Sequence, residues 1–210
     1  GVPKCTCGGM IKPDVVLYEE GLDNGVISEA VRAISQAQVL IIGGTSLADA
    51  VQIAKVKKII EADPARRYIV PSVPGKSDRY QIKVTDLLYG LEHAIEQGED
   101  YRPFYDKIFA RFTDIKRDLG LSVNIEARLE EILANLLDGA GADYAASRGE
   151  YLNGMLLADY LGYAFVDAAE VILFDKRGKY DEKRTEKALS ERLRGLEHSA
   201  GGRLGGGGSA

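Results

Sequence analysis

The chain has 210 residues, of which 45% are hydrophobic and 28% are charged, and its formal net charge is −5. This apolar content is ordinary for a globular protein, and the length allows one medium domain or two small ones. No basic patch stands out, which argues against nucleic acid or an anionic membrane as a partner. The longest apolar run, residues 39–42, is too short to span a bilayer, and no signal peptide is visible, so a cytoplasmic location is expected.

The first part of the chain predicts a loop, a strand, a helix and a second strand in that order. Residues 1–12 are rich in Gly and Pro and predict a loop, and residues 15–18 predict a short strand. Asp23 or Asn24 is expected to cap a helix that runs to about Gln36. Residues 37–42 form a continuous apolar run, which is typical of a strand buried on both faces of a parallel sheet.

The middle of the chain predicts one βαβ unit. A helix is expected to begin at Ser46 or Asp49 and to end before Pro64, which cannot continue it. Residues 68–70 predict a second strand, and residues 71–78 predict a loop. A strand, a Gly-rich turn, a helix and a strand in this order favour two parallel neighbouring strands.

Helices dominate the rest of the sequence. Amphipathic patterns predict them at residues 83–97, 101–119, 124–139, 149–161 and 181–196. Two short strands are expected at residues 165–168 and 171–174. The Gly-rich residues 199–210 cannot bury enough surface to offset the entropy of ordering them, so they predict a flexible tail.

Three stretches near the N-terminus carry a family resemblance. They are Cys5-Thr6-Cys7-Gly8-Gly9, Lys12-Pro13-Asp14-Val15-Val16-Leu17-Tyr18-Glu19-Glu20 and Val39-Leu40-Ile41-Ile42-Gly43-Gly44-Thr45-Ser46-Leu47. Residues 1–47 resemble the C-terminal end of a sirtuin, an NAD-dependent deacylase. The resemblance implies that Gly44, Thr45 and Ser46 contact the nucleotide of NAD. The family's catalytic histidine and its Gly-rich NAD-binding start lie earlier than this stretch, so NAD is not expected as a cofactor.

The two cysteines do not predict a metal site. Sirtuins hold zinc with two Cys-x-x-Cys pairs, whereas Cys5 and Cys7 form one Cys-x-Cys pair and are the only cysteines of the chain. Tetrahedral zinc requires four ligands, so zinc is not expected and no metal ligand is assigned. The two thiols are also poorly spaced for a structural disulfide.

A second resemblance begins at the same glycine-rich turn. The stretches that carry it are Gly43-Gly44-Thr45-Ser46-Leu47-Ala48-Asp49-Ala50, Lys83-Val84-Thr85-Asp86-Leu87-Leu88, Ala134-Asn135-Leu136-Leu137-Asp138-Gly139, Asp143-Tyr144-Ala145-Ala146-Ser147-Arg148-Gly149-Glu150-Tyr151-Leu152 and Asp167-Ala168. From residue 43 to about residue 198 the chain resembles an aspartokinase. The resemblance implies an α/β amino-acid-kinase fold, a three-layer α/β/α sandwich with a mainly parallel sheet, incomplete here. It also implies amino-acid biosynthesis by phosphoryl transfer from Mg-ATP to the side-chain carboxylate of L-aspartate.

The glycine-rich turn is the candidate phosphate site. A turn at a helix N-terminus presents backbone N–H groups to phosphate oxygens, and Gly43 and Gly44 fit this role. By resemblance, Thr45 and Ser46 line the phosphate or aspartate site, and Ser72 faces it. The tetrapeptide Gly-Gly-Thr-Ser of residues 43–46 is also common in strand-to-helix turns that bind nothing.

Glu150 is the candidate ligand for the substrate's ammonium group. It matches the family's glutamate in that role, and a carboxylate is the natural partner of an ammonium. An acid near a helix start is also favoured by the macrodipole alone. Lys76 and Lys83 are interpreted as solvated lysines.

Two departures from the aspartokinase pattern predict weak or no turnover. The family's strand ends Lys-Phe-Gly-Gly-Thr-Ser, and its lysine contacts the transferring phosphoryl group, whereas this chain has Ile41. Losing one such stabiliser typically costs about 10²–10³ in rate. The family's kinase domain also continues past the length seen here, with most of its ATP pocket, so no catalytic residue is assigned.

Three hypotheses remain open from the sequence. The first is an impaired aspartokinase-like protein that binds L-aspartate and ATP with Mg, and a homodimer is compatible with it. The second is a non-enzymatic chimeric fragment, and the third is an NAD-binding sirtuin remnant. The expected division is a sirtuin-like fragment at 1–42, an aspartokinase-like part at 43–198 and a Gly-rich tail at 199–210.

Overall fold

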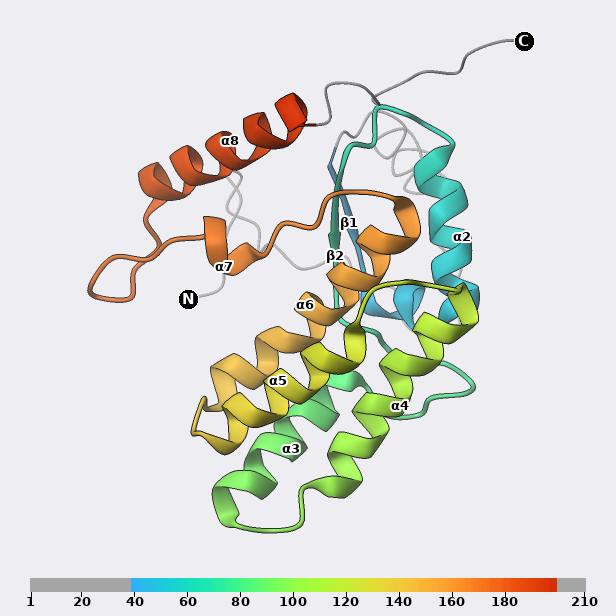
Figure 1. Ribbon diagram of the computed structural model, residues 1–210, viewed down its shortest axis with the longest axis vertical. Coiled ribbons are helices and arrows are strands. Elements are labelled where there is room, and N and C mark those ends of the chain that lie inside the picture. Colours follow the sequence, from blue (N-terminus) through green and yellow to red (C-terminus); the bar gives the residue numbers. More distant parts are fainter. Residues whose placement is uncertain (1–38, 200–210) are drawn as a thin grey trace, which may run out of the picture.

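The computed structural model describes residues 39–199, and the elements follow one another as Figure 1 shows. They are β1 (Val39–Ile42), the 3-10 helix η1 (Gly44–Leu47), α2 (Ala50–Glu61), β2 (Tyr68–Pro71), α3 (Val84–Gln97), α4 (Arg102–Leu119), α5 (Ile125–Leu137), α6 (Ala142–Leu161), α7 (Ala168–Val171) and α8 (Glu182–Ser199). The strand predicted at 15–18, the helix predicted at 24–36 and residues 200–210 of the tail predicted at 199–210 lie outside the described residues, whereas Ser199 ends α8.

The predicted βαβ unit is confirmed. β1 and β2 pair in parallel, with Ile41 opposite Val70 in the register. The helix between them begins at the later of the two expected positions, because the side chain of Asp49 accepts a hydrogen bond from the N–H of Gln52 at 3.0 Å and caps α2.

The prediction that the first strand is buried on both faces is wrong within the described residues. Ile42 is buried, but Ile41 is 77% exposed and Val70 is 50% exposed. Side chains alternate between the faces of a strand, so Ile41 and Ile42 point to opposite sides of the two-stranded sheet. No element between residues 39 and 199 covers the side of Ile41 and Val70.

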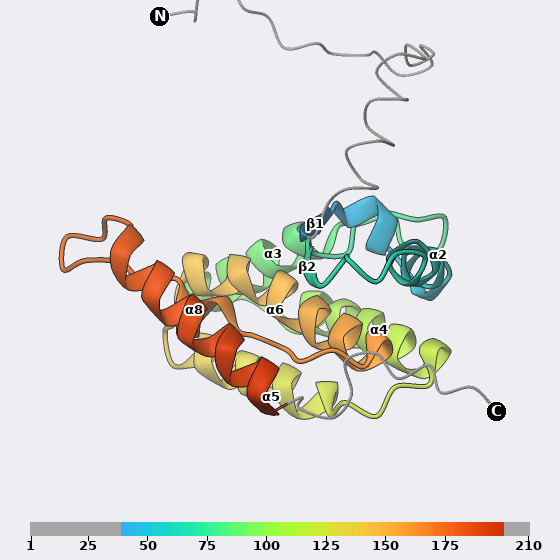
Figure 2. The ribbon, with the colours of Figure 1, turned by 90° about the horizontal axis from the view of Figure 1, so that it is seen from above.

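Four helices, α3 to α6, form a bundle, and α6 packs beside β2 (Figure 2). The core is formed where the apolar stripes of the four helices meet, as the amphipathic patterns predict. Its centre is made of fully or almost fully buried side chains, among them Leu88, Leu91, Phe112, Leu129 and Leu152.

The helix ends follow from local chemistry. Asn124 caps α5 as expected, since its side chain accepts the N–H of Ala127 at 3.2 Å. Gly120 ends α4 with a φ of 66°, a left-handed conformation that glycine adopts without steric cost. The predicted helices at 83–97, 101–119 and 124–139 are therefore confirmed to within two residues of their ends.

Two predictions for the second half need correction. The helix expected at 149–161 begins at Ala142, because Gly149 lies inside α6 and does not start it. The strands expected at 165–168 and 171–174 are not formed: Ala168–Val171 is the short helix α7, capped by Asp167, and Phe174 makes only an isolated bridge to Tyr180.

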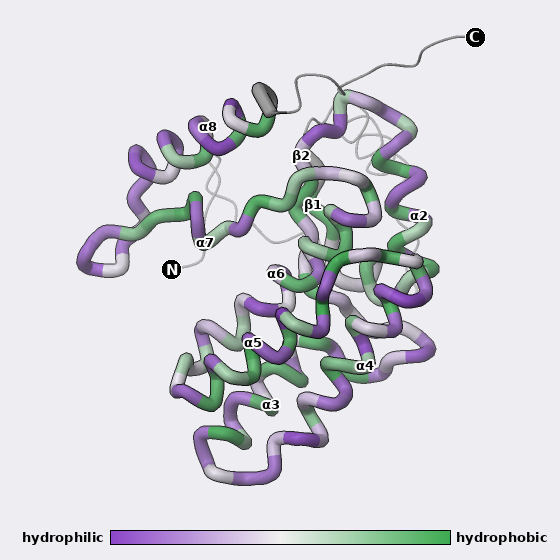
Figure 3. Tube along the Cα trace, viewed as in Figure 1, coloured by the Kyte–Doolittle hydropathy of each residue, from purple (hydrophilic) through white to green (hydrophobic). Residues whose placement is uncertain are grey.

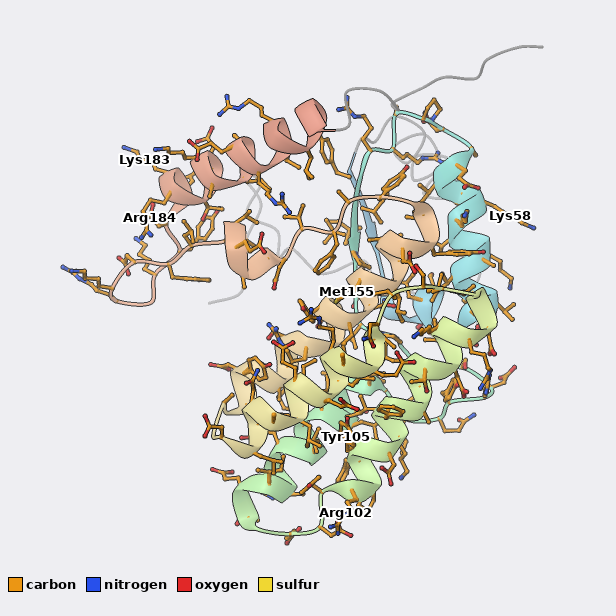
Figure 4. The ribbon with its side chains drawn as sticks, viewed as in Figure 1. Lys58, Arg102, Tyr105, Met155, Lys183 and Arg184 are labelled. Carbon is orange, nitrogen blue, oxygen red and sulfur yellow. The ribbon has the colours of Figure 1, made fainter. Side chains whose placement is uncertain are left out.

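The last helix, α8, packs mainly on α7 at the side of the molecule. Arg192 Nε lies 3.7 Å from Glu170 Oε2, and the N–H of Leu173 donates to the Thr185 hydroxyl at 2.9 Å. Figure 3 shows that α8 is hydrophilic along much of its length, and Figure 4 shows Lys183 and Arg184 pointing away from the core. The helix therefore adds little to the central core.

No helix between residues 39 and 199 combines the length and the apolar character needed to cross a bilayer.

The burial of Phe112 predicts that its side chain contributes strongly to the stability of the fold. Phe112 is fully buried in α4, whereas Phe174 is 55% exposed. Phe112→Ala should lower the free energy of unfolding by about 3–5 kcal/mol, since it leaves a cavity, and Phe174→Ala by less than about 1 kcal/mol. Urea unfolding of both variants measures the difference, and equal losses would contradict this placement of the core.

Asp159 of α6 binds the loop between α4 and α5 through hydrogen bonds. Its Oδ2 accepts the backbone N–H of Ser122 at 2.7 Å and that of Val123 at 3.0 Å. Hydrogen bonds from Val123 and then from Ser122 hold the pKa of Asp159 below its usual value. A carboxyl group with a lowered folded-state pKa stabilises the fold above its unfolded pKa, and this stabilisation is lost as the pH falls through the folded pKa.

Asp159→Asn should therefore lower the free energy of unfolding by about 1 kcal/mol near neutral pH. The difference from the unchanged chain should shrink as the pH drops below about 4, where carboxyl groups of the unfolded chain become protonated. Urea unfolding across this pH range is the measurement, with the exposed Asp106→Asn as the matched control. A difference that does not vary with pH would show that the Asp159 charge is not what stabilises the loop.

Candidate functional site

The carboxyl ends of β1 and β2 open onto a cavity of about 250 Å³. It is lined by Gly44, Thr45, Ser72, Val73, Pro74, Gly75, Lys83 and Thr85. Open α/β sheets bind ligands outside the carboxyl ends of their parallel strands. We call this cavity the strand-end pocket.

The structure brings three of the six candidate site residues into the lining: Gly44, Thr45 and Ser72. Gly43 precedes them as the N-cap of η1, and Ser46 lies exposed in η1, outside the lining. The glycine-rich turn leads into this four-residue 3-10 helix and not directly into α2. The turn therefore lies at the N-terminus of a short 3-10 helix, and α2 begins after it at the Asp49 cap.

The two loops that form the pocket touch through their backbones at Gly44 and Gly75. The N–H of Gly75 donates to the Gly44 carbonyl at 2.7 Å. A Cβ on Gly44 would lie 2.5 Å from the Val73 carbonyl oxygen, and one on Gly75 would lie 2.7 Å from the Gly44 carbonyl carbon. Glycine is thus required at both positions for this approach. Within the described residues, the N–H groups of Gly44 and Thr45 have no acceptor.

One face of α6 holds the peptide unit between Ser72 and Val73. Asn153 Nδ2 donates to the Ser72 carbonyl at 2.6 Å, and the Val73 N–H donates to Glu150 Oε1 at 3.4 Å. Gly149, one residue before Glu150, leaves room for the Val73 side chain, which any Cβ at that position would meet. Asn153 is fully buried, and its Oδ1 has no partner among the described residues. These contacts fix where Ser72 enters the pocket.

Glu150 lies beside the pocket and not in its lining. It is exposed and sits more than two turns from the start of α6 at Ala142, so the interpretation of Glu150 as a helix-start acid is wrong. Among the described residues its carboxylate makes one hydrogen bond, the long one from the Val73 N–H, and it is therefore available to a cation entering the pocket.

Arg111 of α4 fixes the loop after β2 and was missed by the sequence reasoning. The residue is 2% exposed, and its guanidinium donates to the Gly75 carbonyl and lies 3.8 Å from the centre of the Tyr80 ring. Burial lowers the pKa of Arg111 to about 10, so it remains protonated at neutral pH. The signal in the sequence was a basic residue inside the apolar stripe of Ile108, Phe112 and Ile115.

Tyr80 completes this attachment. Its hydroxyl donates to Asp114 Oδ2 at 2.7 Å, and Arg79 pairs with the same carboxylate at 2.5 Å. Burial, followed by the bond to Asp114, raises the pKa of Tyr80 to about 12. The loop from Ser72 to Lys83 is therefore held by α6 at its beginning and by α4 along its length.

Two further lining residues were not assigned from the sequence. Lys83 was interpreted as solvated, yet it lines the pocket as the N-cap residue of α3, and Thr85 follows in the first turn. Ile41 is not in the lining, and its side chain is mostly exposed. The available signal in the sequence was that Lys83 and Thr85 follow a loop and lie at the start of a predicted helix.

The pocket does not itself offer a magnesium site. Its lining contains hydroxyl and backbone groups and a lysine but no carboxylate, and Mg²⁺ is usually held by carboxylates together with substrate phosphates. No cluster of three or more His, Cys, Asp or Glu residues suited to a metal occurs between residues 39 and 199.

The N-terminal residues match a known family. Residues 2–51 match the Sir2 family. An NAD-dependent protein deacetylase of Clostridium perfringens is 73% identical over 48 residues, which are 22% of this chain and 20% of the relative. This match ends shortly after the glycine-rich turn.

The remaining residues match aspartokinases. Aspartokinase 3 of Bacillus subtilis is 32% identical over 140 residues, which are 64% of this chain and 31% of the relative. The crystal structure of the aspartate kinase of Clostridium acetobutylicum is 46% identical, with a TM-score of 0.71 over 74% of this chain and 36% of that one. The chain spans about a third of the length of these relatives. It therefore has an amino-acid-kinase fold over most of its length, is homologous to aspartokinases there, and is similar to Sir2-family deacetylases over residues 2–51.

Proposed function

We propose that the strand-end pocket binds L-aspartate and the terminal phosphate of Mg-ATP, as an aspartokinase-like site with weak phosphoryl transfer to the aspartate side chain. The observation that supports this is the meeting of Gly44, Thr45 and Ser72 in one cavity, with Glu150 at its edge. The aspartokinase relatives support the substrate class. Such an activity belongs to amino-acid biosynthesis in the cytoplasm and needs neither a nucleic acid nor a membrane.

The roles of the residues follow from charge. The N–H groups of Gly44 and Thr45 and the hydroxyls of Thr45 and Ser72 donate to carboxylate or phosphate oxygens. The Glu150 carboxylate forms an ion pair with the ammonium group of aspartate and accepts hydrogen bonds from it. The aspartate side chain is already ionised near neutral pH, so its oxygen attacks the terminal phosphorus without a general base, and ADP leaves with the bridging oxygen. Positioning and charge compensation are then the main tasks of the protein.

Ile41 limits this chemistry. It occupies the place where the resembling family has a lysine that contacts the transferring phosphoryl group, and an isoleucine cannot compensate negative charge. Removing one such stabiliser costs about 10²–10³ in rate, which is the basis for proposing weak turnover.

A second proposal concerns the origin of the chain. The Sir2 match over residues 2–51 and the aspartokinase match over most of the remainder support a chimera joined near Gly43 to Leu47. The proposed parts are 1–42, 43–198 and a tail at 199–210. A separate alternative is an NAD-binding sirtuin remnant, in which Gly44 and Thr45 contact the nucleotide, and adding NAD should then shift the melting temperature where Mg-ATP does not.

Replacing Ile41 by lysine should increase activity. The site is 77% exposed, so Ile41→Lys should change the free energy of unfolding by less than about 0.5 kcal/mol. ADP release that depends on aspartate should rise by about 10²–10³. The matched control is Val70→Lys, which places the same charge opposite Ile41 on the exposed face of the sheet. An equal rise in both variants would show that position 41 has no special role.

Glu150→Gln should weaken the binding of L-aspartate by about tenfold or more, because it removes the charge that faces the ammonium group. Binding of Mg-ATP should not weaken. Titration calorimetry with each ligand separates the two effects, and Glu130→Gln, an exposed change on α5, is the control. Unchanged aspartate affinity in Glu150→Gln would rule out the proposed role.

A further inference from the structure

Lys83 is the charged residue in the lining of the strand-end pocket, which otherwise offers hydroxyls, backbone groups and apolar side chains. Its side chain makes no hydrogen bond or ion pair within the described part of the chain, and it does not cap α3. The ammonium group is therefore free to follow a ligand on a flexible stem.

The pocket needs such a charge because its neighbours do not supply one. Ile41 is apolar and lies outside the lining. Arg111 is close through Gly75, but it is buried, and its guanidinium is engaged by the Gly75 carbonyl and the Tyr80 ring. An oxyanion in the pocket would otherwise meet only neutral donors, which bind anions less strongly than charged ones.

We infer that Lys83 binds the oxyanion, a phosphate or a carboxylate, that enters the strand-end pocket, and supplies charge that position 41 lacks. The identity of the oxyanion as aspartate or the ATP phosphate rests on the proposed function. The position of Lys83 in the lining, next to Thr45, Ser72 and Thr85, is independent of that proposal.

The chain offers a matched control in Lys76. It is also exposed and also lacks a side-chain partner in the described residues, and it belongs to the same loop, but it is not in the lining. Lys83→Ala and Lys76→Ala therefore remove the same charge from neighbouring positions. Lys83→Arg keeps the charge, and a thermal melt of each variant shows whether it is folded.

The test is titration calorimetry of the full chain with tripolyphosphate alone and with L-aspartate alone. Lys83→Ala should weaken the binding of one or both by about tenfold or more, while Lys76→Ala stays within about twofold and Lys83→Arg retains binding. The ligand that is affected identifies the oxyanion as phosphate or carboxylate.

The remaining outcomes distinguish the role of Lys83 from the proposed function. If Lys83→Ala binds both ligands as tightly as the unchanged chain, the role of Lys83 is overturned and the proposed function stands. If tripolyphosphate binding depends on Lys83 but L-aspartate does not bind, the role of Lys83 stands and the aspartate site is contradicted. If the unchanged chain binds neither ligand, both are overturned.

Discussion

The contact between the backbones of Gly44 and Gly75 is the constraint on which the candidate site depends. The hydrogen bond between them joins the turn after β1 to the loop after β2, and neither position has space for a Cβ. This contact encloses Thr45 and Ser72 in one cavity at the carboxyl ends of the strands. A side chain at either glycine would separate the two loops and open the pocket.

The helical bundle keeps this contact in place. α6 holds the Ser72–Val73 peptide through Asn153 and Glu150, and α4 holds Gly75 through Arg111. Both helices take their positions from the buried core that they share with α3 and α5. Two polar side chains, Asn153 and Arg111, are buried at the cost of an unpaired atom each, within the described residues. That arrangement favours a role in fixing the loops over a role in packing alone.

Local patterns in the sequence were sufficient for the strand–helix–strand unit and for most of the helical bundle, since caps such as Asn124 and stops such as Gly120 act within a few residues. They failed where tertiary contacts decide. The sequence around Gly149 predicts a helix start there, but Gly149 lies inside α6, where the Val73 side chain needs room. Residues 168–171 form a short helix because Asp167 caps it. Lys83 and Arg111 were not assigned, because only the folded loop brings Lys83 beside Thr45 and Ser72 and brings Gly75 to Arg111.

The proposed anion site combines an apolar residue at position 41, a lysine at position 83 and the hydroxyl and backbone donors of the strand-end pocket. We propose that this pocket assembles and binds L-aspartate and Mg-ATP. The most direct measurement is a thermal melt of the chain with and without L-aspartate and Mg-ATP. A cooperative melt that the ligands shift upward is predicted, since a ligand at about 100 times its Kd stabilises a fold by about 2.7 kcal/mol. A broad melt that neither ligand shifts would contradict the claim.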